Sequence, residues 1–397
     1  MNPSSPGWIN KFGSLLKTKE VPFLTYEELY LELLNHGFIY GIHLDIPSFI
    51  TTEHRLSEDE IAKINLLAGL YFSYRFEVDN SNFEEFVETV FTFYQEMEVG
   101  RISFLNKILS GNKTMTQLEK LLDSRIYLNG NVFNKAFGNS LTNSLLYIDV
   151  LIFKAYLSNT PSLTMHAQLL EYVTINIAYQ ALNSKEANES DAKLMQLLAS
   201  SLTYVDLKNA NFEGTYADLL QQNFSDSEKD YLLDIACLTV WEDSNLDHSE
   251  SEFIFAISDA LNKTKNKAKN ALENVKKFFE KNHQKIPYLQ DTNLASKFYD
   301  GMTKNVSKLI LRNSKRLKKE LSESRELVQL LAKSASKDLN EGERKKVQGQ
   351  LLDIFKSIPS LAIFMLPGGA VLLPIFIKLI PKLLPSAFDD NRVEENQ

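Results

Sequence analysis

Carboxylates that could bind a metal ion gather in one joint of the chain, within residues 225–261. Two Ser-x-x-Glu capping boxes predict helices before and after this joint, because their side chains bind the free amides of a helix start. The joint contains four carboxylates, at Glu242, Asp243, Asp247 and Glu250. Carboxylate oxygens are the ligands that Ca²⁺ and Mg²⁺ prefer in proteins. The spacing therefore predicts a weak metal site formed by Asp243, Asp247 and Glu250.

A calcium-binding EF-hand is excluded at this joint. Counted from Asp243, the loop would place His248 at its sixth position and Ile254 at its twelfth, where an EF-hand requires glycine and glutamate. Residues 216–262 instead resemble the helical hairpin of TerB-like domains, which are associated with tellurite resistance and stress responses. That resemblance implies metal binding at the acidic turn. It leaves a soluble stress or metal sensor as one functional alternative.

No catalytic motif is found in the sequence. It lacks zinc-binding histidine pairs, a phosphate-binding glycine loop and a serine elbow, and Cys237 lies in an apolar helix, where cysteine acts as a small hydrophobe. His36, His43 and His54 lie near two carboxylates in the sequence, but they would form a metal site only if loops brought them together. Ordinary loop and cap roles explain them more simply. We therefore expect a non-enzymatic protein without a cofactor.

The strongest pattern in the chain is an uncharged apolar run over residues 357–377, bounded by Lys356 and Lys378. As one helix, its 21 residues would be about 31 Å long, close to the hydrocarbon thickness of a bilayer. Three prolines and a Gly-Gly pair interrupt the run, and proline breaks a regular helix because it lacks a backbone donor. We predict a kinked transmembrane helix. A shallow membrane hairpin and a hairpin buried in a soluble core are the two alternatives.

A basic segment lies directly before the apolar run. Residues 262–349 contain 22 Lys and Arg against 10 Asp and Glu, whereas residues 1–261 contain 17 against 36. Positive charge beside an apolar run indicates the cytoplasmic side of a membrane and predicts contact with anionic lipid. The lipid-facing candidates are Lys333, Lys337, Arg344, Lys345, Lys346 and Lys356. A solvated, lysine-rich helix face is the alternative interpretation.

The C-terminal segment, residues 327–390, resembles the membrane segment of the LETM family, the leucine-zipper and EF-hand transmembrane proteins of the mitochondrial inner membrane. The shared features are the helix start at residues 343–345, the ordered prolines and the ending Leu-Pro-Ser-Ala-Phe at residues 384–388. The motif residues of the predicted membrane segment are Pro359, Pro367, Gly368, Gly369, Pro374, Lys378, Pro381, Pro385, Ser386 and Phe388. Among them, the Pro-Gly-Gly at residues 367–369 departs from the family pattern.

In the LETM family this segment spans the membrane and precedes a large ribosome-binding domain, with proposed roles in cation/proton exchange and in translation at the membrane. Here only nine residues follow Phe388, so we expect that domain to be missing, which weakens the case for ribosome binding. The overall layout resembles bacterial LETM-related biofilm-associated proteins. The resemblance implies a scaffold or adaptor on the cytoplasmic side of a bacterial inner membrane, with an unknown protein partner and no DNA partner. An accessory component of cation/proton transport, or a ribosome tether, is the alternative.

The chain as a whole is predicted to be all-α. Its 397 residues are 44% hydrophobic and 24% charged, an ordinary globular balance, and strand-like alternation is nowhere sustained. Asp149 is the one polar residue that we expect to be buried, beside a structural partner. The predicted parts are an acidic helical domain (1–215), the helical hairpin (216–262), a long basic amphipathic neck or coiled coil (263–346), the membrane segment (347–388) and a disordered tail (389–397).

Overall fold

All regular structure in the described part of the chain is helical. The computed structural model describes residues 1–18, 23–52, 54–78, 82–97, 114–126, 145–184, 189–203, 216–220, 224–241, 248–282, 284–285, 294–334, 337, 339–358, 361, 364–365 and 369–389. These residues form eighteen α-helices and one short 3-10 helix, and they contain no strand. The all-α prediction is therefore confirmed.

The N-terminal part packs around α3, a long helix buried along most of its length. Its helices are α1 (Trp8–Thr18), α2 (Tyr26–Asn35), α3 (Glu58–Val78), α4 (Phe83–Glu96), α6 (Thr114–Ile126) and α8 (Leu146–Leu157). The core between them is largely aromatic. The ring centroids of Phe12, Tyr71 and Phe83 lie 5.8 to 6.3 Å apart, at the tilted and edge-on angles that aromatic pairs prefer.

The turn after α2 requires a glycine. Gly37 has a φ of +81°, a left-handed conformation that glycine adopts without steric cost. A Cβ at this position would lie 1.9 Å from the carbonyl oxygen of Ile42 and 2.8 Å from the ring of Phe278. α2 therefore ends just before this glycine, and the close approach of Phe278 shows that the turn also packs against the C-terminal half.

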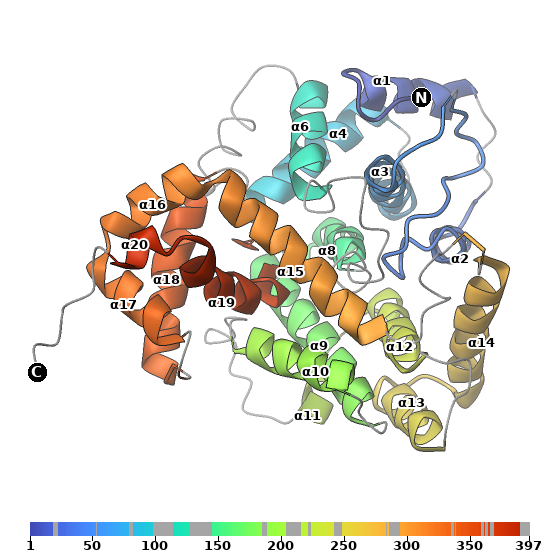
Figure 1. The fold of residues 1–397 in the computed structure, drawn as a ribbon. Coiled ribbons are helices and arrows are strands. Elements are labelled where there is room, and N and C mark those ends of the chain that lie inside the picture. The colour runs from blue at the N-terminus through green and yellow to red at the C-terminus, as the bar shows by residue number, and fades with distance from the viewer. Residues whose placement is uncertain are drawn as a thin grey trace, which may run out of the picture.

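The middle of the chain forms a second group of helices below the first (Figure 1). They are α9 (Leu163–Asn183), α10 (Glu189–Leu202), α11 (Tyr216–Leu220), α12 (Asp226–Val240), α13 (His248–Ala260) and α14 (Lys265–Asn282). α9 packs against α8, α10 and α12. The capping box predicted at Ser225 is formed, since its hydroxyl accepts from the amide of Glu228 and that glutamate accepts from the amide of Ser225.

The basic segment does not form one long arm. It divides into α14, α15 (Leu294–Arg312), α16 (Ser314–Ser322) and α17 (Arg325–Ser334), so the prediction of a continuous neck or coiled coil is wrong for the described residues. The apolar stripe of α15, with Met302, Val306 and Ile310 fully buried, packs against α10 and α19 (Figure 1). The same periodicity suits a coiled coil or a helix laid on a protein core, and here the core is the partner.

The apolar run is divided as well. α18 (Glu341–Ser357) ends where the run begins, and the run continues through η6 (Gly369–Val371) into α19 (Leu373–Leu383), followed by α20 (Ser386–Asp389). Ile358 is extended, as the residue before a proline must be, which explains why α18 stops there. Within the described ranges, no helix is both long and apolar enough to cross a bilayer. The predicted single transmembrane helix is therefore not confirmed.

Most described apolar side chains of the run lie inside the protein. Ile358, Leu361 and Phe376 are fully buried, and the rings of Phe355, Phe364 and Phe376 lie 4.7 to 5.1 Å apart. This packing agrees with the alternative of a hairpin buried in a protein core. Residues 390–397, most of the predicted disordered tail, lie outside the described part of the chain.

Candidate functional site

A cavity of about 220 Å³ lies where the C-terminal helices meet the body of the protein. Its wall consists of one face of α10, one residue of α15, the link from α17 to α18, and the first half of α19. The lining residues are Lys193, Gln196, Leu197, Ser200, Thr203, Tyr299, Ser334, Lys337, Leu339, Arg344, Pro374, Ile375, Ile377 and Lys378. We call this the basic pocket, since its described lining contains four cationic residues and no acidic one.

The cations of the basic pocket have no acidic partner among the described residues. Lys193, Lys337, Arg344 and Lys378 each lie more than 4.0 Å from every carboxylate oxygen that the structure describes. Four cationic groups from four separate stretches of the chain therefore line one cavity without a carboxylate partner in the described part of the chain. Such a convergence is repulsive in the absence of an anion.

Four lysines of α17 and α18 are, by contrast, paired with carboxylates. Lys333 contacts Glu343 at 2.6 Å, and Lys346 contacts Glu326 at 2.6 Å. Ion pairs also join Lys345 to Glu341 and Lys356 to Asp353. The six residues predicted to face lipid thus separate into four with carboxylate partners and two, Lys337 and Arg344, at the basic pocket.

Helix starts and helix periodicity place the pocket residues. Asn340 caps α18 by accepting from the amide of Glu343 at 2.9 Å, and this fixes Arg344 one turn into the helix. Pro374 occupies the first turn of α19, where its missing amide costs nothing, and Lys378 follows four residues later on the same face. The α10 residues recur at threes and fours from Lys193 onward, so they form one face of that helix.

The LETM-like motif residues have several roles in the structure. Pro374 and Lys378 line the basic pocket, Gly369 begins η6, and Pro381 lies inside α19. The closing motif forms the turn and short helix α20, with Pro385, Ser386 and Phe388. Pro359, Pro367 and Gly368 lie outside the described residues. The described motif residues therefore range from the buried Gly369, through the pocket wall at Pro374 and Lys378, to the exposed Pro385 and Ser386.

The predicted acidic metal site is only partly described. Asp243 and Asp247 lie outside the described residues, whereas Glu250 is buried in the first turn of α13. Within the described ranges, no group of three or more His, Cys, Asp or Glu residues is placed to hold a metal ion. The metal site at the acidic turn stays a prediction. Of the three histidines considered in the sequence, His36 and His43 are buried, whereas His54 is exposed.

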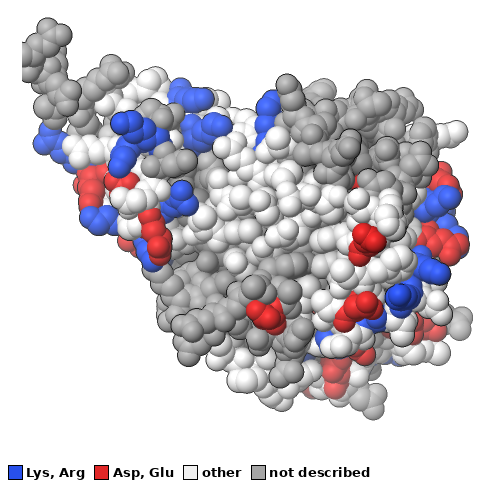
Figure 2. Space-filling view, turned by 90° about the horizontal axis from the view of Figure 1, so that it is seen from below, with Lys and Arg blue, Asp and Glu red and all other residues white. Residues whose placement is uncertain are grey.

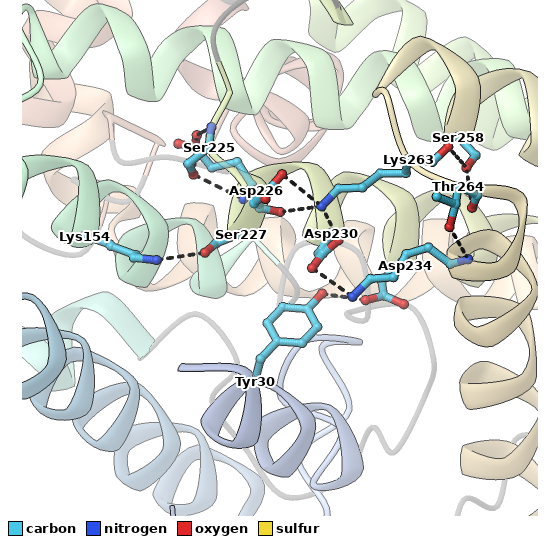
Figure 3. A network of polar contacts seen from close by, with 12 residues as sticks. Tyr30, Lys154, Ser225, Asp226, Ser227, Asp230, Asp234, Ser258, Lys263 and Thr264 are labelled. Atoms are coloured by element: carbon cyan, nitrogen blue, oxygen red, sulfur yellow. Dashed lines mark hydrogen bonds and ion pairs between the residues drawn. The ribbon is translucent and has the colours of Figure 1, made fainter. Parts of the chain in front are cut away.

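A different set of carboxylates joins three helices (Figure 3). Asp226, Asp230 and Asp234 recur every four residues along one face of α12. Lys263, just before α14, contacts Asp226 at 3.2 Å and Asp230 at 2.8 Å. The hydroxyl of Tyr30 on α2 donates to Asp234 at 2.5 Å. This arrangement ties α2 and α14 to α12.

Burial controls the charge of the innermost carboxylate in this set. Removal from water raises the pKa of Asp234 to about 7, and the hydrogen bond from Tyr30 opposes part of that rise. A neutral carboxyl group is therefore favoured at this position below neutral pH.

The comparisons with known proteins concern the end of the chain. Residues 339–397 match a family model described as LETM1-like, RBD. The C-terminal segment is LETM1-like. Within the described part, the match starts at Leu339 in the pocket wall and includes Arg344 and Lys378. No curated protein and no solved structure matches the chain.

The match confirms the LETM-like resemblance of the C-terminal segment and changes one expectation. The matched model carries the name of the ribosome-binding domain itself, and it falls on the residues that the sequence analysis assigned to a membrane segment. The expected absence of that domain therefore does not hold for residues 339–397. The biofilm-associated layout and the TerB-like hairpin receive no support from these comparisons.

Proposed function

We propose that this protein is a LETM-like adaptor that associates with ribosomes through its C-terminal helices. One observation carries the proposal. Arg344 and Lys378, which have no carboxylate partner among the described residues, lie within the residues that match the LETM1-like RBD model, and Lys337 lies just before them. Ribosomes expose RNA phosphates, and unpaired Lys and Arg side chains bind phosphates by displacing condensed counterions.

The charge distribution of the whole chain supports contact with the ribosome through the C-terminal half. Residues 1–261 carry a strong acidic excess and would be repelled by RNA, whereas residues 262–349 are basic. On the lower face, Lys and Arg stand beside Asp and Glu both at the side where α16–α18 lie and at the opposite side (Figure 2). The acidic body would thus stay accessible to a second partner, as an adaptor requires.

The proposal assigns no reaction to the protein. The described lining of the basic pocket includes no carboxylate, imidazole or thiol that would act as a general base or a nucleophile. Binding is therefore the function that this lining supports best.

Attachment to the cytoplasmic face of a bacterial inner membrane is the second candidate. It is favoured by the uncharged run at residues 357–377, which lies beside the basic segment. In this case anionic lipid headgroups would take the place of RNA phosphates. The buried position of Phe364 and Phe376 favours attachment at the surface over insertion of the run.

Co-sedimentation separates the two candidates. Purified full-length protein is centrifuged through a sucrose cushion with ribosomes, or with vesicles that contain anionic lipid, at low and high salt. We expect binding to ribosomes that falls steeply with salt. The double variant Arg344→Glu/Lys378→Glu should lose it, and the matched variant Lys345→Glu/Lys346→Glu should lose much less. Binding to vesicles alone would instead support membrane attachment, and equal losses in both variants would remove the basic pocket from the proposal.

A further inference from the structure

The basic pocket has the size and chemistry of a small-anion site. Its volume of about 220 Å³ corresponds to roughly seven water molecules in the liquid, since each occupies about 30 Å³. This is below the range of about 300–1,000 Å³ that is usual for drug-sized ligands. The volume therefore suits an inorganic or terminal phosphate group better than a complete nucleotide.

The cations around the cavity come from parts of the chain that are far apart in sequence. Lys193 belongs to α10, Lys337 to the link between α17 and α18, Arg344 to α18, and Lys378 to α19. Their convergence is a product of the tertiary fold and not of one lysine-rich helix. The basic pocket lies between the LETM1-like segment and α10 of the body.

Carboxylate pairing distinguishes these four residues from their neighbours. Lys345 and Lys346, which follow Arg344 directly, both contact glutamates. None of the four pocket cations has such a contact among the described residues. A ligand that brought two or more negative charges would replace the missing carboxylates, and an arginine among the cations provides paired donors for a phosphate.

The rest of the lining is suited to hold such an anion in a fixed place. Leu197, Leu339 and Ile375 are almost completely buried, so they form a firm apolar floor. Ser200 also lines the cavity, and its side chain makes no hydrogen bond with any described residue, so its hydroxyl can act as a neutral donor. The site thus combines charged groups, a hydroxyl-bearing residue and an apolar floor.

We infer that the basic pocket binds a small phosphate anion with at least two negative charges, of the diphosphate class, and that this anion links the LETM1-like segment to α10. The inference goes beyond the proposed ribosome association and does not depend on it. Free pyrophosphate and the end of a nucleotide both carry this diphosphate group, so the pocket would recognise the same group in either.

Calorimetric titration of the full-length protein with inorganic pyrophosphate tests the inference. We expect saturable binding by the native protein and a melting temperature that rises with the pyrophosphate concentration. Arg344→Gln and Lys378→Gln should each weaken binding about tenfold, the effect of losing one charge-assisted hydrogen bond. Lys346→Gln, which removes an equal charge two residues from Arg344, should bind as the native protein does.

The melting temperature of each variant without pyrophosphate shows whether a loss of binding comes from a loss of folding. Removal of an uncompensated pocket cation should leave it unchanged or slightly higher, because a repulsion disappears. If Arg344→Gln unfolds the protein, Lys193→Gln on the exposed face of α10 replaces it with the same expected loss of binding. Titration with adenosine diphosphate distinguishes a nucleotide end from free pyrophosphate.

Two results would overturn the inference. One is the absence of saturable pyrophosphate binding at millimolar concentration. The other is an equal loss of binding in Arg344→Gln and Lys346→Gln, which would show a diffuse electrostatic attraction. If ribosomes bind while pyrophosphate does not, the anion site fails and the proposed function stands.

Discussion

The N-terminal body and the LETM1-like segment bury their side chains in different ways. In the body, Arg125 and Asp149 form a buried ion pair with hydrogen bonds of 2.7 and 3.0 Å, and the hydroxyl of Tyr94 donates to the same carboxylate. The described core of the LETM1-like segment contains only apolar side chains, with Phe355 and Phe376 at its centre. Its described charges lie at the surface or around the basic pocket.

This difference explains why the apolar run resembles a membrane span. A core without any polar group has the composition of a hydrocarbon-embedded helix, and composition alone does not tell whether lipid or protein covers it. Proline and glycine break the run into pieces that are too short to span a bilayer, such as the 11 residues of α19. The positions of proline and glycine therefore predict the structure of this run better than its hydropathy does.

Breaking the buried ion pair of the body should have the largest effect on stability. Asp149→Ala leaves the Arg125 guanidinium buried without its carboxylate, which costs about 3–5 kcal/mol in the free energy of unfolding. Urea denaturation followed by circular dichroism measures this loss. The double variant Arg125→Met/Asp149→Leu removes both charges and should recover most of the stability. A midpoint that barely moves in Asp149→Ala would mean that water reaches the pair.

Truncation of the aromatic centre of the LETM1-like segment should cost a similar amount. Phe376→Ala removes a fully buried ring and leaves a cavity, with an expected loss of about 3–5 kcal/mol. The measurement is urea denaturation of the full-length protein in buffer without lipid. Lys382→Ala, on the exposed side of the same helix, is the matched control and should have little effect. Equal stabilities of the two variants would indicate that the run is not part of a protein core.

A third effect, of opposite sign, concerns Asp234 on α12. Its pKa is about 7 in the folded protein and about 3.9 in an unfolded chain, so between these values only the folded state keeps the proton. Stability therefore falls as the pH rises from about 4 to about 7 and is constant above. Asp234→Asn, which can still accept from Tyr30, should remove this slope. It should stabilise the protein at pH 8 by at most about 4 kcal/mol.

Denaturation curves at pH 5 and pH 8 provide the measurement. Asp226→Asn is the matched control on the same face of α12, since its carboxylate is exposed and its pKa is lowered by Lys263. That variant should not gain stability at pH 8. A pH slope that persists in Asp234→Asn would assign the effect to another group.

Local features of this fold were predictable from the sequence, and contacts between distant segments were not. The capping box at Ser225 was predicted correctly, because a helix start is decided within four residues. The burial of Asp149 was also predicted, from its apolar neighbours. Its partner, Arg125, is 24 residues away, and no pattern in the sequence connects the two.

The basic pocket shows the same division. Lys337 and Arg344 were predicted to face lipid, and Lys378 was predicted to be a motif residue of the membrane segment, because the sequence does not show which cations have carboxylate partners. Lys193 was missed. It lies on α10, more than a hundred residues before the others, and only the packing of α10 against α15 and α19 brings it to the cavity.

The smallest effect expected is that of a surface ion pair in the LETM1-like segment, and it completes the contrast with Arg125 and Asp149. Lys346 and Glu326 contact each other at 2.6 Å, but both side chains are more than half exposed. Water and salt screen such a pair, and the two long side chains lose entropy when they are held together. We expect Lys346→Ala, Glu326→Ala and the double variant to have unfolding midpoints that agree within error. A coupling that survives 0.5 M salt would show that this surface is covered in the folded protein, for example by the residues that follow α20.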